Sequence, residues 1–352
     1  MAGPPHVAWR FGYKGLMELT TVADDHAVVH DGLAFRRYDD LEPDTVYEFD
    51  GFAFRTLVRP SGERLATFAT VNDVHFGEVE CGILEGLDLG PTFSVADGEE
   101  PYPETMNRGA IHEIEQLDPD VVLAKGDLTS EGTEEQYRDF LEFYAEAFGD
   151  RLVHTRGNHD VHGDADFASE PTQRVDLPGA TLAVLDTSVA GRAGGHVTGE
   201  QLEWLHDLAA EADRPVYVFG HHHVWSPDSA QYKGAHFGID PDASVRLVEV
   251  VAARPTIRGY FAGHTHRNRV RHISISRDVP WVEVACVKDF PGAWAEYRVY
   301  EGGLLQVFHR ISTPDALVWA EKTRNMFGGM YFGYSFGDLG DRCFAVPAHR
   351  PT

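Results

Sequence analysis

Residues 65–75 read LATFATVNDVH, and the rest of the chain repeats the pattern that they set. The first seven residues, up to Val71, are mostly apolar and β-prone, which predicts a buried strand. Polar residues follow at once: Asn72, Asp73 and, two positions later, His75. In an extended turn the Asp73 and His75 side chains point the same way, because one residue separates them. The stretch therefore predicts a strand with a carboxylate and an imidazole at its carboxyl end.

Four later segments also place ligand-type side chains directly after an apolar strand. In chain order they are Gly126-Asp127, Gly157-Asn158-His159-Asp160, Gly220-His221-His222-His223 and Gly263-His264-Thr265-His266. From Arg64 onwards strands alternate with helices, and this alternation predicts parallel strands with helices covering both faces. Ligands bind beyond the carboxyl ends of such strands. We therefore expect all five segments to meet at one rim.

Together the segments offer a mixed set of oxygen and nitrogen donors. The candidate metal ligands are two carboxylates, one amide oxygen and four imidazoles, from Asp73, Asp127, Asn158, His75, His221, His264 and His266. Such a set suits manganese, iron or zinc and does not suit calcium. It is large enough for two adjacent metal ions, which recur in enzymes that cleave phosphate esters. We prefer His221 because it comes first after its strand and glycine, and His222 is the alternative ligand.

The composition limits the functions that the chain can have. A formal net charge of −26 in 352 residues repels long polyanions, so we expect a small phosphate ester as partner and no duplex nucleic acid. No apolar run approaches the ~20 residues that span a bilayer, so we expect no membrane contact. Residues 1–5 lack the basic and apolar regions of a signal peptide, and we expect a cytoplasmic protein. A homodimer is the assembly that we consider.

The order of the five segments resembles the calcineurin-like metallophosphoesterase superfamily. Its pattern runs Asp-x-His, Gly-Asp, Gly-Asn-His-Asp/Glu, Gly-His-x and Gly-His-x-His, and the match spans residues 65–311. The resemblance implies a four-layer α/β/β/α sandwich that holds two metal ions. It assigns one metal to Asp73, His75, Asp127 and His266. It assigns the other metal to Asp127, Asn158, His221 and His264, with Asp127 as the bridging ligand.

The resemblance also implies catalytic roles for two residues that follow Asn158. His159 is similar to the family's histidine beside the substrate, which stabilises developing charge or protonates the leaving oxygen. Asp160 either orients the His159 imidazole or holds the turn. The implied nucleophile is a hydroxide that bridges the two metals. Ser130 stands where purple acid phosphatases carry a tyrosine, so we do not expect a tyrosinate–iron bond.

Two further segments resemble the branch that contains cyclic-nucleotide phosphodiesterases and glycerophosphodiesterases. They are Leu185-Asp186-Thr187 and Gly199-Glu200-Gln201-Leu202-Glu203-Trp204-Leu205. We therefore expect a phosphodiesterase acting on a small diester of cyclic-nucleotide or glycerophosphodiester type. The alternatives are a phosphomonoesterase acting on a nucleotide or sugar phosphate, and a non-catalytic interaction module with the same fold. The intact ligand set argues against the interaction module.

The chain divides into three expected parts. Residues 1–63 form a small β-rich module that resembles a fibronectin-like domain, or alternatively extend the main sheet. Residues 64–312 form the metallophosphoesterase catalytic domain, and residues 313–352 form a C-terminal extension that packs over it. Residues 77–103 are too long for an ordinary connection and are expected to form a loop or lid over the site.

Overall fold

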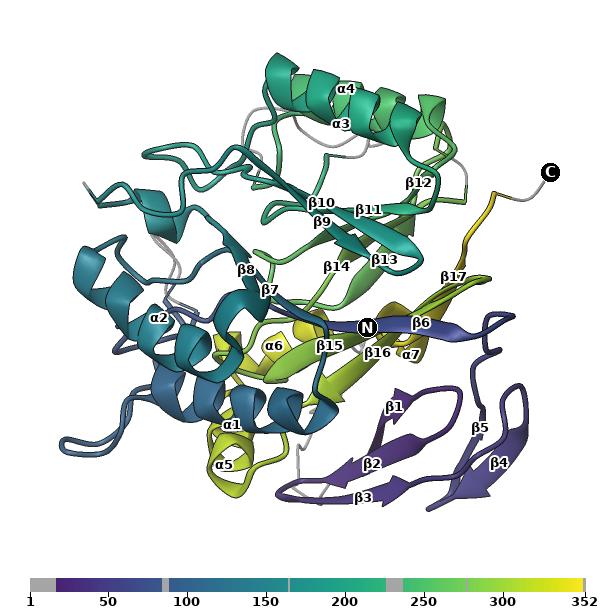
Figure 1. The fold of residues 1–352 in the computed structure, drawn as a ribbon. Coiled ribbons are helices and arrows are strands. Elements are labelled where there is room, and N and C mark those ends of the chain that lie inside the picture. Colours follow the sequence, from purple (N-terminus) through teal and green to yellow (C-terminus); the bar gives the residue numbers. More distant parts are fainter. Residues whose placement is uncertain (1–16, 84–88, 164, 226–236, 277, 351–352) are drawn as a thin grey trace, which may run out of the picture.

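Two six-stranded sheets pack face to face, and helices cover the outer face of each sheet (Figure 1). The computed structural model describes residues 17–83, 89–163, 165–225, 237–276 and 278–350. Between the sheets lies an apolar core to which both contribute, including Phe68 and Tyr297 from one sheet and Phe219 and Phe261 from the other. The expected four-layer α/β/β/α sandwich is confirmed.

The first sheet combines parallel and antiparallel strands. Its order is β17-β16-β15-β6-β7-β8, with bounds Phe344–Pro347, Gly303–Arg310, Ala293–Tyr300, Arg64–Val71, Val121–Lys125 and Leu152–Thr155. Strands β6, β7 and β8 are parallel, as expected from the alternation of strands and helices. The alternation of strands with helices does not extend to β15 and β16, which run antiparallel. Only residues 301–302 connect them, and a parallel crossover needs a dozen or more residues.

The second sheet has a parallel centre and antiparallel edges. Its order is β13-β14-β12-β11-β10-β9, with bounds Arg269–His272, Pro280–Glu283, Ile257–Ala262, Val216–Phe219, Ala180–Leu185 and Thr172–Leu177. Strands β10, β11, β12 and β14 are parallel, whereas β9 and β13 pair antiparallel at the two edges. The sequence did not predict these edge strands. They read TQRVDL and RVRH, and charged side chains are typical of exposed sheet edges.

The helices form the two outer layers. Helices α1, α2 and α5 pack on the first sheet, with bounds Tyr102–Leu117, Glu134–Phe148 and Pro314–Thr323. Helices α3 and α4 pack on the second sheet, with bounds Gly199–Glu211 and Pro241–Ala253. The expected caps are present: Thr133 accepts a hydrogen bond from the Gln136 amide, and Thr198 forms a capping box with Gln201. Within the described ranges no helix combines the length and apolarity needed to cross a bilayer.

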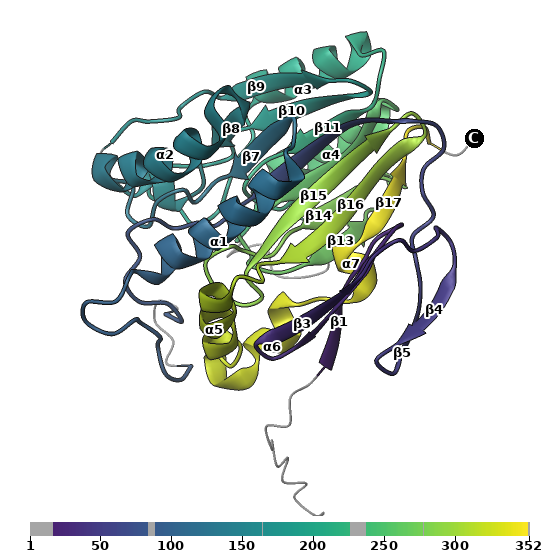
Figure 2. The same cartoon turned by 60° about the horizontal axis from the view of Figure 1, so that its bottom comes forward.

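The N-terminal segment forms its own small β structure beside the first sheet (Figure 2). Strands β1, β2 and β3 form a three-stranded sheet, and β4 pairs with β5 in a hairpin. Their bounds are Met17–Val22, Ala27–Asp31, Ala34–Tyr38, Val46–Phe49 and Phe52–Arg55. These strands join neither six-stranded sheet, which confirms a β-rich module and not an extension of the main sheet. The division after residue 63 stays a prediction.

The C-terminal segment is built into the body of the molecule. After α5 come the short helices α6, Tyr331–Ser335, and α7, Leu339–Arg342, and then β17 at the edge of the first sheet. The side chains of Trp319 and Tyr331 lie in the core beneath α1 and α2. A domain division after residue 312 remains a prediction.

A buried histidine links the N-terminal module to the first sheet. The ring of His30 lies between two hydroxyls, with Nδ1 2.9 Å from Thr20 Oγ1 and Nε2 3.0 Å from Ser312 Oγ. Burial and the charge of Arg310 lower the pKa of His30 to about 3. The imidazole is therefore neutral in the folded protein at pH 5, whereas an exposed histidine with a pKa of about 6.5 is mostly charged.

This linkage predicts that acid weakens the folded state through His30. The unfolded chain binds a proton here below pH ~6.5 and the folded chain does not, so stability is lost as the pH falls from about 6.5 towards 3. Between pH 7 and pH 5 the loss amounts to about 2 kcal/mol. Urea unfolding at both pH values should show that loss reduced in His30→Gln. The exposed-site variant His112→Gln serves as control, and an equal reduction in both variants would contradict the assignment.

Candidate metal centre

The five segments converge between the two sheets, although they follow strands of different sheets. Three follow β6, β7 and β8 of the first sheet, and two follow β11 and β12 of the second sheet. Asp127 lies between two of the histidines, with Oδ2 3.4 Å from His75 Nε2 and 3.3 Å from His221 Nε2. Asp73 Oδ1 is 3.4 Å from His266 Nε2 and 4.0 Å from His221 Nε2. Each carboxylate thus lies near two histidines, and His221 lies near both carboxylates.

The backbone turns sharply where β6, β7 and β12 end. Five non-glycine residues of the candidate set have a left-handed backbone, with φ between 50° and 67°: Asp73, His75, Asp127, His264 and His266. Non-glycine residues in this region cost roughly 1–3 kcal/mol each and persist only where the surroundings enforce them. The turns bring these five side chains together beyond the carboxyl ends of the strands.

Glycines make this close approach possible. A Cβ atom on Gly157 would lie 2.2 Å from Asp127 Oδ1, and one on Gly126 would lie 2.7 Å from His221 Nδ1. Gly126 also has φ +88°, a conformation that other residues rarely adopt. The glycines in these motifs therefore allow the ligand-type side chains of neighbouring turns to approach one another.

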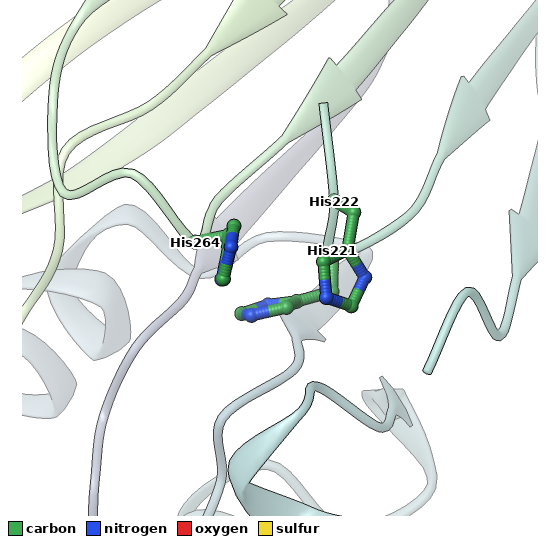
Figure 3. A group of neighbouring side chains, drawn as sticks. All are labelled: His221, His222 and His264. Carbon is green, nitrogen blue, oxygen red and sulfur yellow. The ribbon is translucent and has the colours of Figure 1, made fainter. Parts of the chain in front are cut away.

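The two adjacent histidines after β11 have different surroundings. Figure 3 shows His221, His222 and His264 grouped together, and they offer ligand atoms within 4.8 Å of one another. Both ring nitrogens of His222 have protein partners, the Thr187 hydroxyl at 2.8 Å and the Ala193 carbonyl at 3.2 Å. His221 Nδ1 donates to the Lys125 carbonyl at 2.9 Å, while its Nε2 has no hydrogen-bond partner. This geometry favours His221 over His222 as a ligand.

Several buried atoms that could bind a metal form no hydrogen bond with the protein. Among the described residues, His75 Nε2, His221 Nε2 and Asn158 Oδ1 are buried without a hydrogen bond. Leaving a buried polar atom unsatisfied costs about 1–3 kcal/mol. Imidazole nitrogens and amide oxygens are ligands for transition metals. The residues present therefore fit the metal centre that the motifs imply.

The electrostatics of the site point the same way. Burial would raise the pKa of Asp127, but the charges of His221 and His159 hold it well below its ordinary value. Burial opposes a charge on His221, yet Asp127 raises its pKa to about 9. Burial and the charge of Lys288 lower the pKa of His75 to about 4. The buried carboxylates are thus ionised and stabilised by positive charge, which metal cations can also provide.

The two residues expected to be catalytic lie in the same turn and have different surroundings. His159 is half-buried, 4.6 Å from His75 between ring centroids, and its Nδ1 is 2.7 Å from the Ser130 carbonyl. Asp160 is fully buried and accepts hydrogen bonds from the amides of Leu128, Thr129 and Gly157, and from the Thr129 hydroxyl. Of the two roles considered for Asp160, these contacts favour holding the turn. The Ser130 carbonyl, which the sequence did not indicate, orients His159.

The sequence motifs did not indicate some residues that lie at the site. Lys288 and Asp289 follow residues 281–287, which are apolar except for Glu283, and Asp289 Oδ2 lies 3.8 Å from His266 Nδ1. A polar pair after an apolar strand is the same signal that marked the other five segments, and it could have been used here. Glu78, in the expected 77–103 loop, lies 3.7 Å from His75. Residues 84–88 of that loop lie outside the described part.

Comparison with known proteins agrees with the fold and the motifs. Residues 66–268, more than half of the 352-residue chain, match the family model of the calcineurin-like phosphoesterases. The chain therefore belongs to this family.

Curated relatives are phosphodiesterases by name. The chain is 30% identical over 166 residues to a cAMP/cGMP dual specificity phosphodiesterase of Mycobacterium tuberculosis, covering 43% of this chain and 49% of the relative. It is 28% identical over 182 residues to the glycerophosphodiester phosphodiesterase GpdQ of Enterobacter lignolyticus, covering 46% and 63%. The matches thus span less than two thirds of either relative.

Solved structures share the architecture. A dimetal phosphatase from Danio rerio superposes with a TM-score of 0.54 at 14% identity, covering 70% of this chain and 97% of that one. A purple acid phosphatase from yellow lupin gives 0.51 at 13% identity, covering 82% and 57%. At these identities the likeness is one of fold alone.

The contacts of Asp160 predict a structural role that can be measured. Asp160→Ala leaves three buried amides without their acceptor, so we expect a loss of at least about 3 kcal/mol in the free energy of unfolding. Chemical denaturation of the variant and of Asp166→Ala, whose side chain is 80% exposed, measures this loss. Unchanged stability together with an altered pH profile of turnover would instead assign Asp160 to orienting His159.

Proposed function

We propose that the chain is a metal-dependent phosphodiesterase that hydrolyses a small phosphodiester of cyclic-nucleotide or glycerophosphodiester type. The observation that carries the proposal is the group of buried, unpartnered imidazole and amide atoms around the carboxylate of Asp127. Family membership and relatives named as phosphodiesterases support the reaction class. The strongly negative net charge of −26 supports a small substrate over a nucleic-acid polymer.

We assign the ligands in two sets that share Asp127. The first set is Asp73, His75, Asp127 and His266, and the second set is Asp127, Asn158, His221 and His264. Three of the first set, Asp73, His75 and His266, offer ligand atoms within 4.8 Å of one another, as do Asp73, Asp127 and His221. The mixed donors suit two ions of manganese, iron or zinc.

Bound metal ions would supply Lewis-acid activation of the phosphoryl group and a nucleophile at neutral pH. His159 lies beside this centre, since its ring offers a nitrogen within 4.8 Å of ligand atoms of His75 and Asp127. Because Nδ1 donates its proton to the Ser130 carbonyl, Nε2 is the atom that we assign to the substrate. There it stabilises charge on the phosphoryl oxygens or donates a proton to the leaving oxygen.

Metal content tests the choice between the two histidines after β11. His221→Ala should bind about one metal ion fewer per chain than the unmodified protein, because its Nε2 is unpartnered and faces Asp127. His222→Ala is the matched control, since His222 is equally buried and both of its nitrogens have protein partners. Elemental analysis after metal loading measures the ratio. Loss of metal in His222→Ala alone would reverse the assignment.

Turnover tests the role of His159 and the class of substrate. His159→Ala should keep its metal content and lower turnover of bis-p-nitrophenyl phosphate by roughly 10²-fold or more. The neighbouring His162→Ala, with its ring 4.7 Å from His159, is the control and should stay close to the unmodified rate. Loss of metal in His159→Ala would make His159 a ligand. Faster hydrolysis of p-nitrophenyl phosphate than of the diester would favour the phosphomonoesterase alternative.

A further inference from the structure

Behind the two histidines of the first proposed ligand set lie two carboxylates. His75 Nδ1 is 3.7 Å from Glu78 Oε2, and His266 Nδ1 is 3.8 Å from Asp289 Oδ2. The Nε2 atoms of both rings face the ligand cluster instead. Each imidazole therefore has its outer nitrogen next to an acidic residue that is not itself assigned as a ligand.

The histidines of the second set have a different outer environment. His221 Nδ1 lies 2.9 Å from the Lys125 carbonyl, and His264 Nε2 lies 2.6 Å from the Phe237 carbonyl. Their outer partners are neutral backbone oxygens. In the first set the outer nitrogens thus have carboxylates as near neighbours, and His75 Nδ1 has no hydrogen-bond partner among the described residues. In the second set backbone carbonyls lie at hydrogen-bond distance from the outer nitrogens.

One buried lysine joins the two carboxylates. Lys288 Nζ donates to both Glu78 oxygens, at 2.6 and 2.5 Å, and lies 3.9 Å from Asp289 Oδ2. The Lys288 and Asp289 side chains are only 6% and 2% exposed. Burial opposes the charge on Lys288, but Glu78 and Asp289 hold its pKa above the ordinary value. The lysine therefore stabilises the ionised form of Glu78 beside His75 and places its positive charge next to Asp289.

The C-terminal segment also takes part in this arrangement. The Tyr331 hydroxyl on α6 donates to Asp289 Oδ1 at 2.5 Å and lies 3.5 Å from His266 Nδ1. The Cys286 thiol donates to the same Asp289 oxygen at 2.9 Å. Asp289 is therefore held by two donors on one oxygen, which leaves the other oxygen towards His266.

A further metal site is the obvious alternative, because His266, Cys286 and Asp289 offer ligand atoms within 4.8 Å of one another. The hydrogen bonds of Asp289 speak against it, because its Oδ1 already accepts from the Tyr331 hydroxyl and the Cys286 thiol.

We name these residues the support network: Glu78, Lys288, Asp289 and Tyr331. We propose that the support network positions His75 and His266 for the first metal and tunes the affinity of that site alone. Carboxylates behind ligand imidazoles hold the proton on the outer nitrogen, fix the ring orientation and raise ligand basicity. Loss of such partners lowers metal affinity by about 10–100-fold. The inference rests on the proposed function, since it presupposes the two ligand sets.

Calorimetric titration of the full-length, metal-depleted protein with Mn²⁺ tests the proposal. Asp289→Asn and Tyr331→Phe should each weaken one of two binding steps, by about tenfold or more for Asp289→Asn, and leave the other step unchanged. Tyr297→Phe is the matched control, because Tyr297 is also buried and donates to Gln306 at 3.0 Å in the core between the sheets. The control should keep both steps. If Asp289→Asn does not fold, Tyr331→Phe decides the outcome.

The possible results separate this inference from the function on which it rests. Two metal ions bound by the unmodified protein, with affinities unchanged in both variants, would overturn the support network and leave the proposed function standing. Equal weakening of both steps would also overturn it, because the claim concerns the first site alone. An unmodified protein that binds no Mn²⁺, Fe²⁺ or Zn²⁺ would overturn the proposed function itself.

Discussion

The burial of two ionised carboxylates is the constraint on which the rest of this structure depends. Asp73 and Asp127 are 0% and 2% exposed, and a charged group so far from water is costly unless opposite charge surrounds it. The histidines around them can supply positive charge. The left-handed backbone at the strand ends and the glycines in the motifs allow these side chains to come close together. A pair of metal cations would supply more positive charge beside the two carboxylates.

The sandwich makes this burial possible because it brings the carboxyl ends of strands from both sheets together. Asp73 and Asp127 come from the first sheet, and His221 and His264 come from the second. The apolar core between the sheets, where the Phe68 ring of the first sheet lies 5.8 Å from the Phe219 ring of the second between centroids, sets the separation of the two sheets. Packing far from the centre therefore controls distances within it. The C-terminal helix α6 adds a further contact through Tyr331 and Asp289.

Much of the candidate centre could be predicted from sequence, because its ligands follow apolar strands in short motifs. The caps at Thr133 and Thr198 were predicted for the same reason, since a cap depends on residues within one helical turn. The polar edge strands β9 and β13 were not predicted, because their formation depends on a neighbouring strand supplied by the fold. Lys288 and Asp289 were also missed, although they follow an apolar stretch as the five segments do. Their contacts with Glu78 and His266 come from the fold.

By itself the sequence determined the types of candidate ligand, their order and their position at strand ends, since each of these depends on residues within a few positions of one another. Only the tertiary structure distinguished His221 from its neighbour, because the difference lies in contacts with Thr187, Ala193 and Lys125. It also placed Asp160 against the amides of a different turn. Hydrogen bonds between distant segments depend on how the two sheets pack, and no local pattern records that packing.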